Sequence, residues 1–257
     1  MTARFLSSAA VVGLLALSAA GCTTTASRNG SPSIASASAQ RSLVDAWGER
    51  YRAKPSDPTA AMNYAKALTA EERRAQAVSV LEQATMHNPR DPALLGAYGR
   101  ALASVGRLNQ AVEVLGRAHS PDKPDWRVLS AHGAVLDQMG RHQDARRYYA
   151  SALKIAPNEP AVLSNLGLSY ALSKDLTKAE ETLRQAAAQS SADPRVRQNL
   201  ALVLGLQGQF GEAEKLARAD LSAEQANANV AYLRQMIAEH REKKPPTRTA
   251  RIAAKGR

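Results

Sequence analysis

Histidine is the residue type through which this sequence could most readily bind a metal. A metal centre needs several such ligands at a characteristic spacing. The chain instead has five histidines that fit no zinc motif: His87, His119, His132, His142 and His240. His132 occupies an apolar position of a helical pattern, so we interpret it as a packed residue of a helix. The histidines therefore predict no metal site.

Two short motifs could indicate catalysis or nucleotide binding. Ser151 and Lys154 have the Ser-x-x-Lys spacing in which a lysine can assist a serine nucleophile, but the motif lies within a helical pattern and lacks partner motifs. Gly205, Gly208 and Gly211 are three residues apart and follow no predicted strand, whereas a dinucleotide-binding loop connects a strand to a helix. We therefore predict no catalytic site and no cofactor.

The single cysteine of the chain, Cys22, follows a segment typical of export signals. Residues 1–21 combine a basic start at Arg4 with an apolar stretch, Phe5–Leu17, that is too short to span a bilayer. The small residues Ala19–Gly21 before Cys22 are similar to a bacterial lipobox, in which the cysteine is lipidated and becomes the first mature residue. The alternative is an ordinary signal peptide cut elsewhere. We predict lipidation at Cys22 and no intramolecular disulfide.

Residues 22–40 are rich in Ser, Thr, Ala and Gly, and we predict a flexible tether there. Thr23, not an aspartate, follows Cys22. By resemblance to the enterobacterial sorting rule, this implies a lipid anchor in the outer membrane, facing the periplasm.

A period of 34 residues organises the chain from Pro58 onward, and no insertion breaks it. The predicted repeats are residues 58–91, 92–125, 126–159, 160–193 and 194–221. Small residues occur in every repeat at positions 8 and 20, where two helices must cross closely: Ala65, Gly99, Gly133, Gly167 and Ala201 at position 8, and Ala77, Ala111, Ala145, Ala179 and Ala213 at position 20.

This pattern resembles the tetratricopeptide repeat, a helix–turn–helix unit that stacks into a solenoid. Apolar residues at positions 4, 7, 8 and 11 share one face of a first helix, and those at 20, 24 and 27 share one face of a second. An acidic residue precedes position 1, which is usually proline, as expected for a helix start. Gly106, Gly140 and Gly208 all occupy position 15, between the two helices. We therefore predict an all-α repeat solenoid.

Both ends of the array require a cap, because a terminal repeat lacks one neighbour. Residues 41–57 match the second half of a repeat and predict an N-terminal capping helix marked by Leu43, Val44, Trp47 and Tyr51. Residues 222–242 predict a closing helix. The tail, 243–257, is predicted to be disordered; residues 241–257 hold seven basic residues and one acidic residue of a chain whose net charge is +11. The tail is either a solvated extension or an electrostatic contact with anionic headgroups, peptidoglycan or an acidic partner.

The resemblance implies that the first helices line a concave groove for protein partners. At position 9 of the first two repeats the groove would hold Lys66 and Arg100; positions 9 and 13 of the last two would place Leu168, Leu172, Leu202 and Leu206 on its floor. This pattern suits an amphipathic helix or an extended peptide with acidic residues at one end. Some of these leucines could instead pack against neighbouring repeats. Nucleic acid is not expected, because aromatic residues do not interleave with the basic ones.

Two segments near the end of the chain narrow the family. The sequences VRQNLALVLGLQG, starting at Val196, and NVAYLRQM, starting at Asn229, look like the TadD-type lipoproteins of tight-adherence pilus systems. That family implies a non-catalytic, pilotin-like scaffold that positions the outer-membrane secretin or another assembly component. The alternative is an adaptor for peptidoglycan hydrolases or for outer-membrane protein insertion. The oligomeric state cannot be predicted from the sequence.

Overall fold

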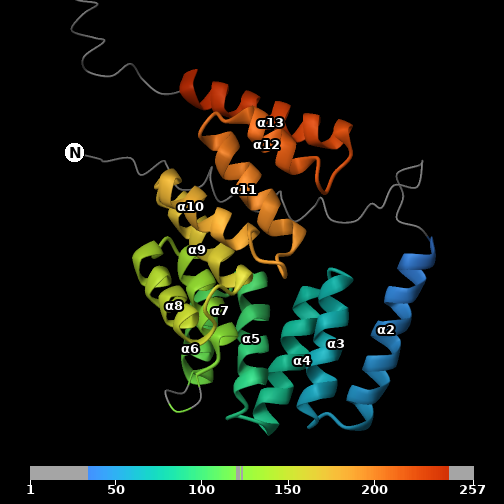
Figure 1. Cartoon of the computed structure of the whole chain (residues 1–257). Helices are drawn as coiled ribbons and strands as arrows, with labels where there is room; N and C mark the ends of the chain where they lie inside the picture. The colour runs from blue at the N-terminus through green and yellow to red at the C-terminus, as the bar shows by residue number, and fades with distance from the viewer. Residues whose placement is uncertain (1–33, 120–121, 123, 243–257) are drawn as a thin grey trace, which may run out of the picture. The chain divides into compact units, whose positions relative to one another are not determined.

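The computed structural model describes residues 34–119, 122 and 124–242. The predicted signal peptide, Cys22, most of the tether and the basic tail lie outside these residues. Within them all regular secondary structure is helical, in twelve helices from α2 to α13 (Figure 1). None of the described helices combines the length and apolar character needed to cross a bilayer.

The chain forms two compact units, residues 1–157 and 158–257. The described helices of the first unit are α2 (Ile34–Ala53), α3 (Pro58–Ala70), α4 (Arg74–His87), α5 (Pro92–Ser104), α6 (Leu108–Ala118), α7 (Trp126–Gln138) and α8 (His142–Ile155). Those of the second unit are α9 (Pro160–Leu172), α10 (Leu176–Ala187), α11 (Pro194–Leu206), α12 (Phe210–Ala217) and α13 (Ala223–Glu242).

Each predicted repeat is a pair of packed helices, and all five first helices begin at repeat position 1. An acidic side chain caps each of them: the Asp91 carboxylate, for example, accepts hydrogen bonds from the amides of Ala93 and Leu94 at 2.9 and 3.0 Å. Such a cap satisfies amides that have no partner inside the helix. The predicted helix starts are therefore confirmed.

The turn between the two helices of a repeat requires a left-handed residue at position 15. Gly140 has a φ of +76° there, a conformation that costs glycine little because it lacks a Cβ. In the first and fourth repeats the same position holds Glu72 and Lys174, with φ of 59° and 68°. The turn is therefore retained without glycine, because the packing of the two helices fixes its geometry.

Contacts between the helices of a repeat depend on small residues. The alanines at position 20 are at most 1% exposed, and the residues at position 8 are buried as well. A methyl group added at Gly133 would lie 2.6 Å from Tyr149 Cε1, and one added at Gly167 would lie 2.6 Å from Leu183 Cγ. These glycines thus leave room for the large side chain at position 24 of the partner helix.

The N-terminal helix differs from its predicted limits. α2 begins at Ile34, so residues 34–40 of the predicted tether are helical. This segment contains three alanines and neither glycine nor proline, so nothing in it stops a helix. Val44 and Tyr51 are buried as predicted, but Leu43 is 52% exposed. Leu43 occupies the face that a first helix covers in a complete repeat, and α2 has no such helix among the described residues.

The closing helix α13 lies where the sequence places it. Its start is a capping box in which the Gln225 amide donates to Ser222 Oγ and the Ser222 amide donates to Gln225 Oε1, both at 3.2 Å. Ala226 and Val230 are buried, and Leu233 packs against Gly205 of α11. The second unit thus ends in a helix that covers its last repeat.

Candidate functional site

The exposed faces of the first helices form the candidate binding surfaces. In the first unit α3 contacts α5 and α5 contacts α7, while in the second unit α9 contacts α11. Each of these helices also packs against the second helix of its own repeat. One face of each first helix is left open; repeat positions 9 and 13 lie on it, and positions 2, 5 and 12 share that side of the helix. We call these open faces the inner face of each unit.

On the inner face of the first unit, Lys66 of α3 and Arg100 of α5 occupy the same repeat position. Both side chains are exposed, and neither forms an ion pair or hydrogen bond with the described residues. The Arg100 guanidinium lies beside Gly96, where an added methyl group would be 3.6 Å from its Nη1. Desolvation lowers the pKa of Arg100, and this effect exceeds the opposing attraction of the Asp125 carboxylate. Arg100 still carries its charge at neutral pH.

Asp137 also occupies an inner-face position of the first unit, but its carboxylate is buried. Tyr149 Oη donates to its Oδ2 at 2.9 Å, and His142 Nδ1 lies 2.8 Å from its Oδ1. Burial, with the nearby carboxylate as the next cause, raises the pKa of Tyr149 far above its ordinary value, so the hydroxyl remains a donor. The sequence analysis did not predict this cluster. Its one signal was Tyr149, which stands at repeat position 24, where leucine is the usual residue.

The inner face of the second unit carries four leucines, two of them at the repeat position that Lys66 and Arg100 occupy in the first unit. Leu168 and Leu172 on α9 and Leu202 and Leu206 on α11 are half-buried. They occupy positions 9 and 13 of two helices that contact each other. Among the described residues of this unit, none of the four belongs to the buried core cluster. They therefore leave an apolar strip partly open to solvent.

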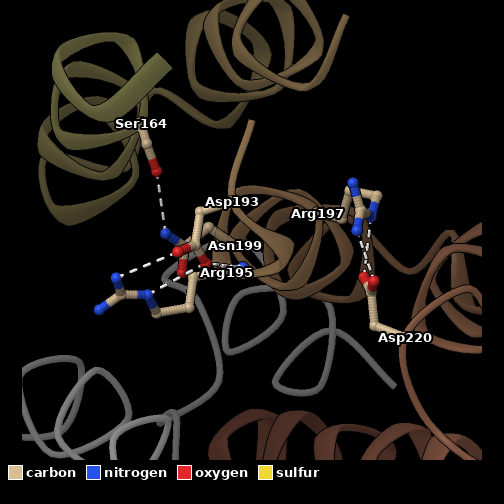
Figure 2. Close-up of polar contacts among 6 residues, drawn as sticks. All are labelled: Ser164, Asp193, Arg195, Arg197, Asn199 and Asp220. Atoms are coloured by element: carbon tan, nitrogen blue, oxygen red, sulfur yellow. Dashed lines mark hydrogen bonds and ion pairs between the residues drawn. The ribbon is translucent and has the colours of Figure 1, made fainter. Parts of the chain in front are cut away.

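Three polar contacts fix the surroundings of α11 (Figure 2). Arg195 pairs with Asp193 at 3.1 Å between Nε and Oδ1. Asn199 Nδ2 donates to Ser164 Oγ of α9 at 3.0 Å, and Arg197 Nε donates to Asp220 Oδ2 at 2.8 Å. The cations of this helix are thus neutralised by carboxylates of the same unit, unlike Lys66 and Arg100.

The sequence predicted one groove holding the cations and the leucines. The structure places Lys66 and Arg100 in the first unit and the four leucines in the second, and it describes each unit by itself. Each unit thus has a candidate surface of its own, cationic in the first and apolar in the second, and the single groove stays a prediction. The assignment of these surfaces to partner binding stays a prediction as well.

The residues that the sequence raised as possible metal ligands or nucleophiles pack against other side chains or form hydrogen bonds within their own helix. His132 is 5% exposed and stacks on Tyr148 with 4.1 Å between ring centroids, and burial, aided by the nearby His119 and Arg141, lowers its pKa. Ser151 Oγ donates to the carbonyl of Arg147 in its own helix. No group of three or more His, Cys, Asp or Glu side chains able to hold a metal occurs in the described part of the chain.

Comparison with known proteins supports the repeat architecture. Two family models described as tetratricopeptide repeat match residues 68–133 and 131–194. No curated protein sequence matches the chain. The agreement of these models with the all-helical structure confirms the predicted fold class, an all-α repeat solenoid.

Solved structures show the same fold at low sequence identity. The Cut9–Hcn1 hetero-tetramer of the APC/C matches with a TM-score of 0.64 at 14% identity, over 79% of this chain but only 40% of that chain. TTC0263, a thermophilic protein of Thermus thermophilus, matches with 0.60 at 23% identity, over 69% of this chain and 98% of that one. PilW, titled a widely conserved type IV pilus biogenesis factor, matches with 0.59 at 17% identity, over 70% and 86%.

Proposed function

We propose that this chain, a tetratricopeptide-repeat protein, is a non-catalytic scaffold anchored by a lipid in the bacterial outer membrane. It would face the periplasm and act, like TadD-type lipoproteins, as a pilotin-like assembly factor for the secretin of a tight-adherence pilus. Its partners would be proteins bound on the inner faces of the repeats. The lipobox-like segment before Cys22 and the two family-like segments near the end of the chain support this proposal.

The apolar strip of the second unit is the observation that carries the binding role. Leu168, Leu172, Leu202 and Leu206 stay half-buried on neighbouring helices, outside the core cluster described for that unit. Partly exposed leucines at the spacing i, i+4 are what an amphipathic helix needs as a docking surface. A protein partner that covers them would bury apolar area that the free chain leaves in water.

The leucine strip can be tested by recovering partners from solubilised envelopes. We expect wild type to recover the secretin or another pilus-assembly component. The double variant Leu168→Ala/Leu202→Ala should weaken that recovery strongly, because truncation at the centre of an interface can cost about 2 kcal/mol or more. The matched control is Leu176→Ala/Leu221→Ala, which shortens two half-buried leucines outside the first helices of the same unit. Equal recovery by both variants, with helicity intact, would place the interface elsewhere.

The identity of the recovered protein separates this proposal from the alternative role. Recovery of a peptidoglycan hydrolase or of the outer-membrane insertion machinery would favour the adaptor function.

The lipid anchor has its own test: Cys22→Ser should release a folded protein into the periplasm. Persistent fractionation with outer membranes and continued labelling by palmitate would contradict lipidation at Cys22.

A further inference from the structure

The inner face of the first unit presents positive charge with no exposed carboxylate on it. Along α3, α5 and α7, positions 2, 5, 9, 12 and 13 hold one acidic residue, Asp137, and both of its carboxylate oxygens are engaged by Tyr149 and His142 inside the unit. The acidic side chain that could have balanced Lys66 and Arg100 is thereby withdrawn from the surface.

Other acidic residues of this unit lie before the starts of α3, α5 and α7 and after the end of α3. Asp57 and Asp91 cap the helix starts and accept hydrogen bonds from backbone amides. Glu71 and Glu72 follow the end of α3, and Glu72 is paired with Arg74. Lys66 lies between the acidic ends of α3, whereas Arg100 has Asp91 before its helix and no acidic residue directly after it.

A third cation, Arg127, shares this inner face but is already occupied. Its guanidinium lies 4.4 Å from the ring centroid of Trp126 and 3.9 Å from Asp125. Lys66 and Arg100 are exposed, and neither forms an ion pair with the described residues. Arg100 and Lys66 are therefore the charges available to a ligand.

We propose that the inner face of the first unit binds an acidic polypeptide segment, whose Asp or Glu side chains pair with Lys66 and Arg100. This inference rests on the proposed scaffold function and names the chemistry of one of its partners. A narrow segment can place its carboxylates on the two cations and avoid Asp57 and Asp91 before the helix starts and Glu72 after the end of α3. A planar anionic membrane would meet those carboxylates as well and would be repelled by them.

The test uses the full chain and a fluorescent peptide of glutamates with an amidated C-terminus. We expect wild type to bind it and Lys66→Glu/Arg100→Glu to bind about tenfold more weakly, since each reversal replaces an attraction by a repulsion. The difference should shrink as salt rises. The matched control, Arg90→Glu/Lys154→Glu, makes the same change of net charge at two exposed cations outside the inner face. The basic tail is present in every variant, and the control variant measures the binding that remains from it and from the net charge.

Equal binding by wild type and the reversed variant would overturn the inference, as would equal weakening in the control. Vesicles rich in phosphatidylglycerol and a uronic-acid polysaccharide are tested beside the peptide. If the reversed variant loses binding to the vesicles or to the polysaccharide but still binds the peptide, the ligand is a lipid or a glycan, and the polypeptide proposal is contradicted. If the reversed variant loses helicity, Lys66→Gln/Arg100→Gln replaces it. The two proposals can fail separately. If partner recovery depends on Leu168 and Leu202 but the glutamate peptide does not bind, the scaffold function stands and this inference is wrong.

Discussion

Gly167 lies where the two helices of the fourth repeat cross, and it has no room for a side chain. A methyl group there would lie 2.6 Å from Leu183 Cγ and 3.3 Å from the carbonyl oxygen of Ala179. We expect Gly167→Ala to destabilise the second unit by about 1–3 kcal/mol, because the packed carbonyl cannot move away easily. Gly211→Ala in α12 is the control, since nothing lies within 4 Å of an added methyl group there. Urea unfolding measures both; equal stability of the two variants would contradict close packing at Gly167.

Tyr149 combines a packing role with a polar one. Its ring fills the space beside Gly133, and its hydroxyl donates to the buried Asp137 carboxylate at 2.9 Å. We expect Tyr149→Phe to keep the packing but to cost about 1–3 kcal/mol, because a buried acceptor loses a donor. Tyr148→Phe removes the hydroxyl of the neighbouring, half-buried tyrosine as a control. A stability unchanged by Tyr149→Phe would show that water replaces the hydroxyl.

The turn that leads into the closing helix α13 is attached to α11 by one ion pair. Arg197 of α11 pairs with Asp220, between α12 and α13, and their side chains are only 30% and 11% exposed. We expect Arg197→Gln to weaken this attachment by about 1–2 kcal/mol, less than a fully buried pair would cost because the arginine is partly solvated.

Hydrogen exchange can locate the effect of that substitution. In Arg197→Gln, amides of α13 should exchange faster while those of α9 and α10 stay near their wild-type rates, because repeat units lose stability locally. Arg195→Gln is the control, since Arg195 pairs with Asp193 at the start of its own helix and is 73% exposed. Faster exchange throughout the unit would argue against a local attachment.

At the scale of the whole molecule, pH should act differently on the two units. Burial lowers the pKa of His132 in the first unit, so below pH about 6.5 the unfolded chain binds a proton that the folded unit resists. The stability of the first unit should therefore fall as pH drops from about 7.5 to 5.5.

The second unit supplies an internal reference for that experiment, because His132 lies outside it. Hydrogen exchange of α7 should accelerate at low pH relative to α11, after correction for intrinsic rates. His132→Gln should reduce this pH dependence, and His87→Gln, at an exposed histidine, should not. An unchanged dependence in His132→Gln would assign the effect to other groups of the first unit.

The helices of this protein follow from local and periodic features of its sequence. The 34-residue period placed both helices of every repeat, and residues such as Asp91 and Gly140 marked helix starts and turns. These features are local or periodic, so the chemistry of a few neighbouring residues is enough to specify them. The small residues at positions 8 and 20 also followed from the period. The start of α2 did not, because alanine-rich sequence sets no sharp boundary for a helix.

The character of the candidate surfaces depends on contacts that form only in the folded chain. The repeat register puts Asp137 on the inner face, but its carboxylate is buried and accepts a hydrogen bond from Tyr149, twelve residues later. Arg197 and Asp220 occupy positions 4 and 27 of the fifth repeat, which are apolar in the other four repeats, and the repeat pattern does not predict that an ion pair forms there. Both depend on which side chains meet in space, and the repeat pattern fixes positions without fixing such partners. Cationic and apolar candidates could therefore be named from the sequence, but their separation into two units could not.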